Sequence, residues 1–209
     1  MSRVKNILYF LEQSWLLLVS SFLFGLLIAL ANSAWSPRIA ANEKAKLDTL
    51  MTNLITQAES FDVAIDKLKI SNEKGVTAEI DVYKAIDDSG KTIGFTFVAS
   101  GSGFTDEIKL VIAADENCQK LFGYQVLKSN ETPGFGDKIK DSFFSSQFVG
   151  APAGSFELIR TGNAEIIDSQ IVAISGATIS STAVVDIFNT YINAVKEKLK
   201  EKGLISNGK

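Results

Sequence analysis

The sequence predicts an α+β domain, with an antiparallel sheet flanked by helices, preceded by one N-terminal transmembrane helix. The middle of the chain holds two pairs of strand-like segments joined by turn residues, whereas the segments on either side have apolar residues at helical spacing. Near the N-terminus, an uncharged apolar stretch runs from Trp15 to Trp35. These three observations together predict the fold class.

The same segments divide the chain. We expect an N-terminal segment at residues 1–14, a transmembrane helix at 15–35, a helical stalk or first domain helix at 36–70, and a domain at 71–209. A chain of 209 residues with 46% hydrophobic content is long enough for one membrane segment and one domain with its own core.

The apolar stretch fits a membrane-spanning helix in length. About 20 residues make a helix of ~30 Å, which matches the hydrocarbon core of a bilayer. The two tryptophans of the chain bracket the stretch, and tryptophan favours both membrane interfaces. A cleaved signal peptide is the alternative, because Arg3 and Lys5 precede the stretch and Ala31-Asn32-Ser33 resembles a cleavage site. A retained anchor is favoured, since signal-peptide cores span only about 7–15 residues.

The next segments alternate between helical and strand patterns. Residues from Ile39 to Phe61 are helix-like, with apolar residues three or four positions apart at Leu47, Leu50, Leu54 and Ala58. Val76 to Ile86 and Thr92 to Val98 alternate around the turn residues Asp87 to Gly90, which predicts a hairpin. A second pair, Glu107 to Ala114 and Lys120 to Lys128, brings the expected sheet to about four antiparallel strands.

A long C-terminal helix is predicted after Ser175-Gly176-Ala177-Thr178. Apolar residues follow at helical spacing, and Gly203 is expected to cap the helix; the apolar positions are Val184, Phe188, Tyr191, Ile192, Val195 and Leu199. The first turn of a helix has unpaired N–H groups that attract an anion, so this start suits a phosphate. The alternative is an ordinary helix entry, because small and hydroxylated residues also cap helices.

Composition excludes several kinds of function. Without histidine, the chain lacks the usual general base and the commonest zinc ligand, and its single cysteine, Cys118, builds neither a disulfide nor a metal cluster. We therefore expect no catalytic residue and no metal site. The net charge of −3 argues against a nucleic-acid partner, which would require a concentrated basic face.

A second motif, a glycine-rich turn, occupies Glu131, Thr132, Pro133, Gly134, Phe135 and Gly136. Together and in this order, the two motifs resemble the flavin-binding G subunit of the Rnf complex and the corresponding C subunit of the sodium-pumping NADH:quinone reductase. The resemblance covers roughly Lys91 to Leu199 and extends to the single anchor. The family often has an acidic residue where this chain has Val172.

The resemblance implies a cofactor and the residues that hold it. FMN would be linked covalently, through a phosphoester, to Thr178, the last residue of the motif that includes Ser175, Gly176 and Ala177. The loop Glu131 to Gly136 would lie near the isoalloxazine ring. A loop containing Gly103 and Phe104 would also contact the flavin. A separate flavin transferase is expected to attach the cofactor, because no histidine is present to activate the threonine.

The resemblance also implies a role and a location. It points to an electron-relay subunit of an ion-translocating ferredoxin:NAD oxidoreductase in the cell membrane, with other membrane subunits of the complex as partners. The N-terminal segment would be cytoplasmic and the domain extracytoplasmic. Three alternatives stay open: the flavin subunit of the quinone reductase, an anchored binding or sensory module without enzymatic activity, and an extracellular flavin reductase with an acceptor of its own.

Overall fold

A computed structural model describes residues 2–71 and 77–206 of the chain. Residues 1, 72–76 and 207–209 lie outside this description, and Val76, the first residue of the first predicted strand, is among them. Two compact units make up the chain, Met1–Ala45 and Lys46–Lys209.

The first unit belongs to helix α1, Ser2–Leu54, whose last turns lie in the second unit. The part of this helix from Glu12 to Leu54 is long and apolar enough to cross a membrane, with a mean hydropathy of 2.3 in its most apolar stretch and no burial there. Pro37 lies inside the helix. The predicted span 15–35 and the predicted helix from Ile39 are therefore one continuous helix.

The second unit is built around a five-stranded antiparallel sheet whose strands follow one another in chain order. The strands are β1 (Ser60–Ser71), β2 (Thr77–Ile86), β3 (Thr92–Ser102), β4 (Glu107–Asp115) and β5 (Leu121–Lys128). The carboxylate of Asp87 accepts hydrogen bonds from the N–H groups of Ser89 and Lys91 at 3.0 and 2.9 Å, which fixes the β2–β3 turn. Pairing of β2 with β3 and of β4 with β5 confirms the two predicted hairpins.

The sequence pattern does not predict strand β1. The helical pattern expected to reach Phe61 ends at Leu54, and Ser60–Ser71 pairs with β2 as a fifth strand. Two register shifts interrupt the pairing, and Lys67 has a positive φ of 49° within the irregular part. Such bulges break the alternation of inward and outward residues by which a strand is recognised in a sequence.

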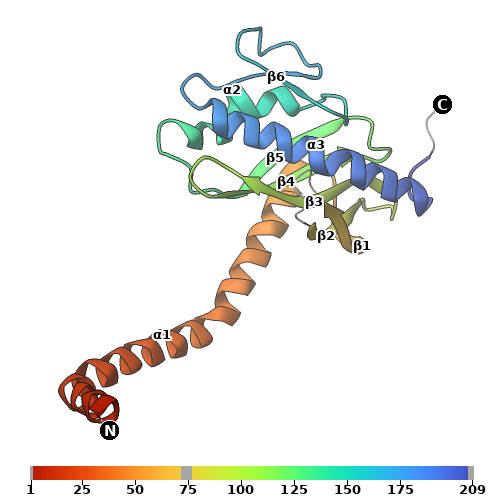
Figure 1. The fold of residues 1–209 in the computed structure, drawn as a ribbon. Coiled ribbons are helices and arrows are strands. Elements are labelled where there is room, and N and C mark those ends of the chain that lie inside the picture. Colours follow the sequence, from red (N-terminus) through yellow and green to blue (C-terminus); the bar gives the residue numbers. More distant parts are fainter. Residues whose placement is uncertain (1, 72–76, 207–209) are drawn as a thin grey trace. The chain divides into compact units, whose positions relative to one another are not determined.

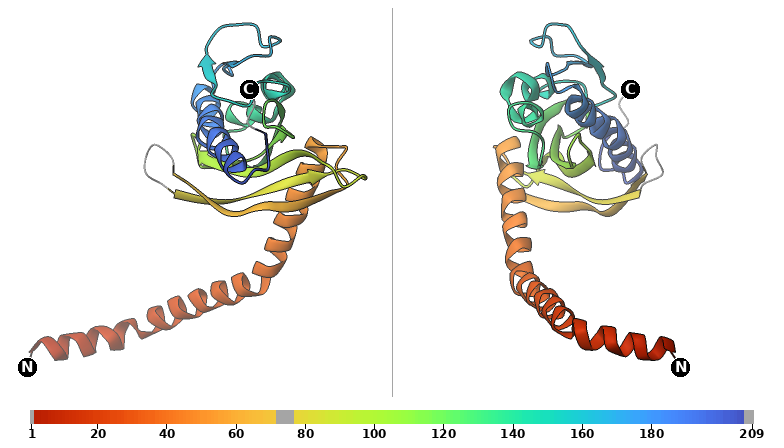
Figure 2. Two further views of the ribbon diagram at one scale, coloured as in Figure 1. Left: turned by 90° about the vertical axis from the view of Figure 1, so that its right-hand side faces the viewer. Right: turned by 60° about the vertical axis from the view of Figure 1, so that its left-hand side comes forward.

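Helix α3, Thr178–Glu201, lies across the sheet, on the same face as the short helices η1 (Gly136–Lys140), α2 (Ser142–Ser145) and η2 (Ser146–Phe148) (Figures 1 and 2). The core lies between these helices and the sheet. At its centre the rings of Phe148 and Phe188 stack with centroids 4.5 Å apart. All six apolar residues that predicted α3 are buried. Gly203, with a φ of +68°, follows the helix, as expected for its cap.

A small second sheet leads into the start of α3. It pairs β6 (Glu157–Ile159) with β7 (Gln170–Val172) in parallel, and strands of three residues are too short to give a sequence pattern. Gln147 holds β7 in place. Its side-chain oxygen accepts a hydrogen bond from the Val172 N–H at 2.7 Å, and its side-chain nitrogen donates to the Val172 carbonyl at 3.2 Å.

Candidate functional site

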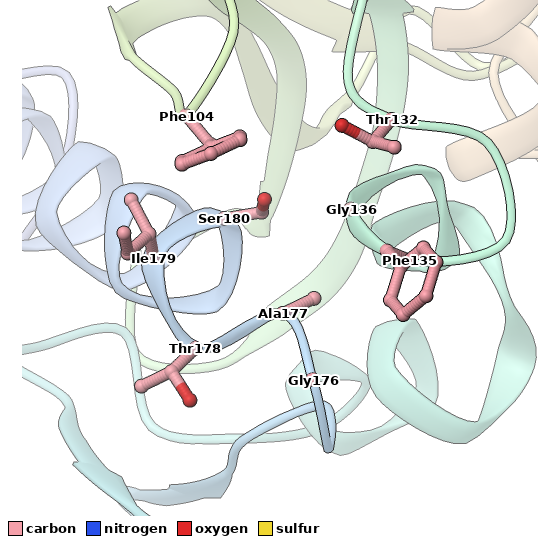
Figure 3. Close-up of a pocket in the computed structure, with 9 residues that line it drawn as sticks. All are labelled: Phe104, Thr132, Phe135, Gly136, Gly176, Ala177, Thr178, Ile179 and Ser180. Carbon is pink, nitrogen blue, oxygen red and sulfur yellow. The ribbon is translucent and has the colours of Figure 1, made fainter.

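A cavity of about 430 Å³ opens at the start of α3. Its walls come from three segments that are far apart in the sequence: the loop after β3, the loop after β5, and the first turn of α3 with the residues before it. The residues that line it are Phe104, Thr132, Phe135, Gly136, Gly176, Ala177, Thr178, Ile179 and Ser180. In Figure 3, Phe104 and Ile179 lie on one side and Phe135 on the other.

The turn before α3 depends on the backbone conformation of Gly176 and on the hydrogen bonds of the Ser181 hydroxyl. Gly176 has a φ of +78°, a conformation that glycine adopts without strain. The hydroxyl of Ser181 accepts a hydrogen bond from the Ile174 N–H and donates to the Ala177 carbonyl, both at 3.0 Å. Ala177 stands at the N-cap and makes no side-chain capping bond. No side chain therefore caps this helix at its N-cap position.

Thr178 is exposed at the start of the helix, and its hydroxyl makes no hydrogen bond within the described part of the chain. The N–H groups of a first helical turn have no intrahelical partners and carry partial positive charge. Among the residues that the structure describes, no lysine or arginine lines the cavity. An anionic group here would thus be held by backbone N–H groups and the helix dipole rather than by a cationic side chain.

The rim of the cavity is apolar. Phe104, Phe135 and Ile179 are 63%, 56% and 58% exposed, although large apolar side chains are more often buried. Phe135 is brought to the start of α3 by a turn in which its N–H donates to the Thr132 carbonyl at 3.2 Å. An apolar rim around a cavity with an anion-attracting end suits a flat, largely apolar ligand that carries a phosphate.

Of the residues expected at the site, seven line the cavity: Phe104, Thr132, Phe135, Gly136, Gly176, Ala177 and Thr178. Five others adjoin these in the chain without lining it: Gly103, Glu131, Pro133, Gly134 and Ser175.

Of the two remaining lining residues, Ser180 is one of the hydroxyl residues expected at the start of the helix, whereas Ile179 was not expected at the site. The only sequence signal of Ile179 is its position directly after Thr178, because the first turn of a helix presents several successive residues to whatever lies at its end.

Glu131 and Gly103 lie behind the cavity wall. Glu131 is 5% exposed, and its carboxylate accepts hydrogen bonds from the Thr105 N–H at 3.0 Å and from the Ser180 hydroxyl. A Cβ on Gly103 would overlap this carboxylate and would lie 2.7 Å from the Asp106 carbonyl oxygen. Gly103 is therefore a glycine because the Glu131 side chain occupies the space beside it.

Asp106 and Asn130 connect the same two loops at the surface. The Asn130 side-chain nitrogen donates to Asp106 Oδ2 at 2.7 Å. A hydrogen bond from the backbone of Glu107, together with the one from Asn130, lowers the pKa of the Asp106 carboxyl. The loop that carries Phe104 is thus attached to the loop after β5 both at the surface and, through Glu131, inside the protein.

A family model described as an FMN-binding domain matches residues 103–193, a range that contains all three walls of the cavity. Among curated proteins, the G subunit of the Na(+)-translocating ferredoxin:NAD(+) oxidoreductase complex of Acetobacterium woodii is 31% identical over 156 residues, which cover 70% of this chain and 72% of that protein.

Two further relatives carry similar names. The G subunit of the proton-translocating ferredoxin:NAD(+) oxidoreductase complex of Clostridium ljungdahlii is 26% identical over 92% of this chain and 91% of its own length. The G subunit of the ion-translocating oxidoreductase complex of Methanosarcina acetivorans is 36% identical over 113 residues, which span 54% of this chain and just 57% of that protein.

Solved structures share the fold. Shewanella oneidensis NqrC superimposes with a TM-score of 0.51 at 21% identity, covering 70% of this chain and 73% of its own. The C subunit of the Na(+)-translocating NADH-quinone reductase from Parabacteroides distasonis gives a TM-score of 0.52 at 19% identity, covering 82% of this chain and 98% of its own. The predicted α+β fold with an antiparallel sheet is thereby confirmed.

Proposed function

The chain belongs to the family of FMN-binding G subunits of ion-translocating ferredoxin:NAD(+) oxidoreductase complexes, and from this premise we propose that it relays electrons through an FMN attached to Thr178. The observation that carries the proposal is the position of Thr178. Its hydroxyl is exposed at the start of α3 and lines a cavity with an apolar rim. The proposed complex is of the Rnf type and sits in the cell membrane.

The residues present fit the two ends of FMN. The N–H groups at the start of α3 would hold the phosphate, and Phe104, Phe135 and Ile179 would cover the flat ring. Gly176 has no side chain, and this leaves free the space beside the Phe135 ring, which a Cβ at this position would approach to 3.4 Å. FMN supplies the electron-accepting and electron-donating chemistry when bound. The protein's own contribution is to bind it, orient it and leave one edge accessible to a redox partner.

The link to Thr178 would be a phosphoester made by a flavin transferase. FMN would be transferred from FAD to Thr178 Oγ1: the bond from the threonine oxygen to phosphorus forms, the phosphoanhydride bond breaks, the hydroxyl proton leaves and AMP is released. The chain holds no histidine to activate the hydroxyl, which is why a separate enzyme is proposed as a partner. Covalent attachment retains the cofactor outside the cytoplasm, where free FMN would not replace a lost molecule.

Intact mass tests the attachment. The full chain is produced with and without a flavin transferase, and the expected excess over the sequence mass is one FMN less one water. Thr178→Ala should abolish the excess, whereas Thr178→Ser should keep part of it because the hydroxyl remains. Thr182→Ala is the matched control, since Thr182 lies one turn further along the helix and its hydroxyl only bonds the Thr178 carbonyl, at 2.9 Å. An excess that survives in Thr178→Ala would refute the assignment.

We propose that α1 anchors the protein as a single membrane-spanning helix, with the domain on the extracytoplasmic side. Fusion of alkaline phosphatase to the C-terminus should give an active enzyme, because alkaline phosphatase folds only outside the cytoplasm. Fusion of green fluorescent protein at the same place should stay dark when exported by the Sec route. Bright fluorescence with inactive phosphatase would reverse the proposed orientation.

A second candidate is the flavin subunit of a sodium-translocating NADH:quinone reductase, favoured by the fold shared with the two solved structures from such enzymes. Co-purification of the tagged chain from native membranes distinguishes the two complexes by their partner subunits. The relay proposal also expects no turnover by the purified chain alone with NADH or a quinone. Steady turnover with a soluble acceptor would instead indicate a free-standing reductase, and a colourless native protein would indicate a binding module.

A further inference from the structure

The Glu131 carboxylate lies at the junction of the three walls of the cavity. One oxygen, Oε1, accepts a hydrogen bond from the Thr105 N–H, and the other, Oε2, accepts one from the Ser180 hydroxyl. Both Glu131 and Ser180 are buried. Each oxygen therefore binds a different segment, and the residue itself begins the third, the loop that carries Thr132 and Phe135.

These contacts span long distances in the sequence. Thr105 is 26 residues and Ser180 is 49 residues from Glu131, so neither contact arises from local structure. Thr105 directly follows Phe104 of the apolar rim, and Ser180 stands two residues after Thr178. The carboxylate thus connects the residue proposed to carry the phosphate with the aromatic residues proposed to cover the ring.

The surroundings are fitted to this side chain. A Cβ on Gly136 would stand 2.6 Å from Glu131 Oε2 and 2.5 Å from Ser180 Oγ, closer than real Cβ atoms approach their neighbours. A Cβ on Gly103 would overlap Oε1. The absence of a side chain at Gly103 and at Gly136 therefore leaves room for the Glu131 carboxylate and the groups packed beside it. Because Glu131 does not line the cavity, it stands behind the wall and not against a ligand.

We propose that Glu131 is a positioning residue, whose carboxylate holds the Phe104 loop, the loop after β5 and the first turn of α3 in one preformed cradle. As a description of a flavin site, the inference rests on the proposed function. The arrangement offers one donor to each of the two carboxyl oxygens, and both oxygens can accept a hydrogen bond. Preformed sites bind more tightly because less conformational entropy is lost when the ligand enters.

Removal of the carboxylate should loosen the cradle. In Glu131→Ala, the Thr105 N–H and the Ser180 hydroxyl lose their buried partner, which should raise the local opening equilibrium about tenfold, or about 1.4 kcal/mol. Glu131→Gln keeps the shape. Its amide oxygen can accept from the Thr105 N–H, and its NH₂ group can donate to the Ser180 oxygen, so most of the order should return.

Hydrogen exchange of the full chain in detergent, produced without flavin transferase, tests this directly. Peptides that cover residues 103–106 and 176–182 should exchange about tenfold faster in Glu131→Ala than in wild type, and Glu131→Gln should restore most of the protection. Asn130→Ala is the matched control, because it removes the exposed hydrogen bond to Asp106 that connects the same loops. Its effect should be the smaller one, since exposed partners are replaced by water.

The outcomes separate the two proposals. Equal exchange in wild type and Glu131→Ala would overturn the positioning role, as would a Glu131→Gln variant no better protected than Glu131→Ala. If Glu131→Ala does not fold, Ser180→Ala removes only the hydrogen bond between the Ser180 hydroxyl and Glu131. Exchange should then be faster at residues 176–182, while residues 103–106 stay protected. Unchanged protection of both segments would overturn the positioning role of Glu131. A wild-type chain that accepts no flavin would refute the proposed function and leave the exchange result valid.

Discussion

The ring of Phe135 faces the backbone of Gly176. A Cβ built on Gly176 would stand 3.4 Å from Cδ1 and 3.6 Å from Cε1 of Phe135, and the glycine has a φ of +78°. The loop after β5 and the turn before α3 therefore meet at a position where one residue has no side chain and the other is aromatic. The cavity depends on this meeting, because both residues line it.

Gly176→Ala should reduce flavin attachment, and its loss of stability should match that of a control glycine outside the site. The positive φ alone costs an alanine about 1–2 kcal/mol, and the added methyl group meets the Phe135 ring at ordinary contact distance. Gly90→Ala is the matched control, because Gly90, in the β2–β3 turn outside the cavity, has a φ of +82° and its Cβ would meet nothing within 4 Å. Thermal unfolding should show similar losses for both variants, whereas intact mass should show less attached FMN in Gly176→Ala only. Equal attachment in both would contradict the importance of this contact.

Phe135→Ala should expose a bound flavin without destabilising the fold. Phe135 is already 56% exposed, so its removal should change the free energy of unfolding by only about 0.5 kcal/mol or less. The flavin ring would nonetheless lose one of its apolar covers, and iodide should quench its fluorescence more strongly. Phe143→Ala is the control, because Phe143 is 57% exposed and does not line the cavity. Identical quenching in the two variants would place the flavin elsewhere.

The sequence was sufficient where local patterns determine structure. Alternation and turn chemistry at Asp87 predicted the hairpin of β2 and β3, and helical spacing predicted the buried face of α3. The motif around Thr178 and the loop containing Phe135 were assigned to one site from a resemblance, and the structure brings them to the same cavity.

Non-local contacts were beyond the sequence. In strand β1, two register shifts and the left-handed backbone of Lys67 interrupt the alternation of inward and outward residues. No sequence pattern predicts that the Glu131 carboxylate accepts a hydrogen bond from Ser180, 49 residues away. Ile179 enters the site because of where α3 lies against the Phe104 loop, and packing of that kind follows from the whole fold.

Gln147→Ala should destabilise the protein although it lies outside the cavity. Gln147 is 1% exposed, and its side chain bonds both the N–H and the carbonyl of Val172. Loss of the amide leaves these two backbone groups without partners in the interior, which costs about 1–3 kcal/mol each. Gln170→Ala, at an exposed position of the same strand, should cost far less. Thermal or urea unfolding of the full chain in detergent measures the stability of both variants. Equal losses of stability would show that the hydrogen bonds from Gln147 to β7 are unimportant.

Ionisation of the Cys118 thiol should lower the free energy of unfolding at alkaline pH. Burial, reinforced by the nearby Asp115 carboxylate, raises the pKa of the Cys118 thiol from 9.0 to about 12. Between these values the unfolded chain has lost the thiol proton and the folded chain has kept it. The folded state then binds more protons, so the contribution of this thiol is complete below pH 9.0 and is lost as the pH rises towards about 12.

Cys118→Ala isolates this contribution from the lysines and tyrosines that titrate in the same range. Alanine accepts the left-handed backbone at this position, where φ is 49°, no less readily than cysteine does, and its smaller size changes stability by an amount that does not vary with pH. The difference in unfolding free energy between wild type and variant should therefore shrink as the pH rises above 9.0. Iodoacetamide should also leave the native thiol unmodified at neutral pH and label it once the chain is unfolded, because the thiolate is the reactive form. A pH-independent difference, or rapid labelling of the native protein, would show that the thiol is neither buried nor protonated as the fold requires.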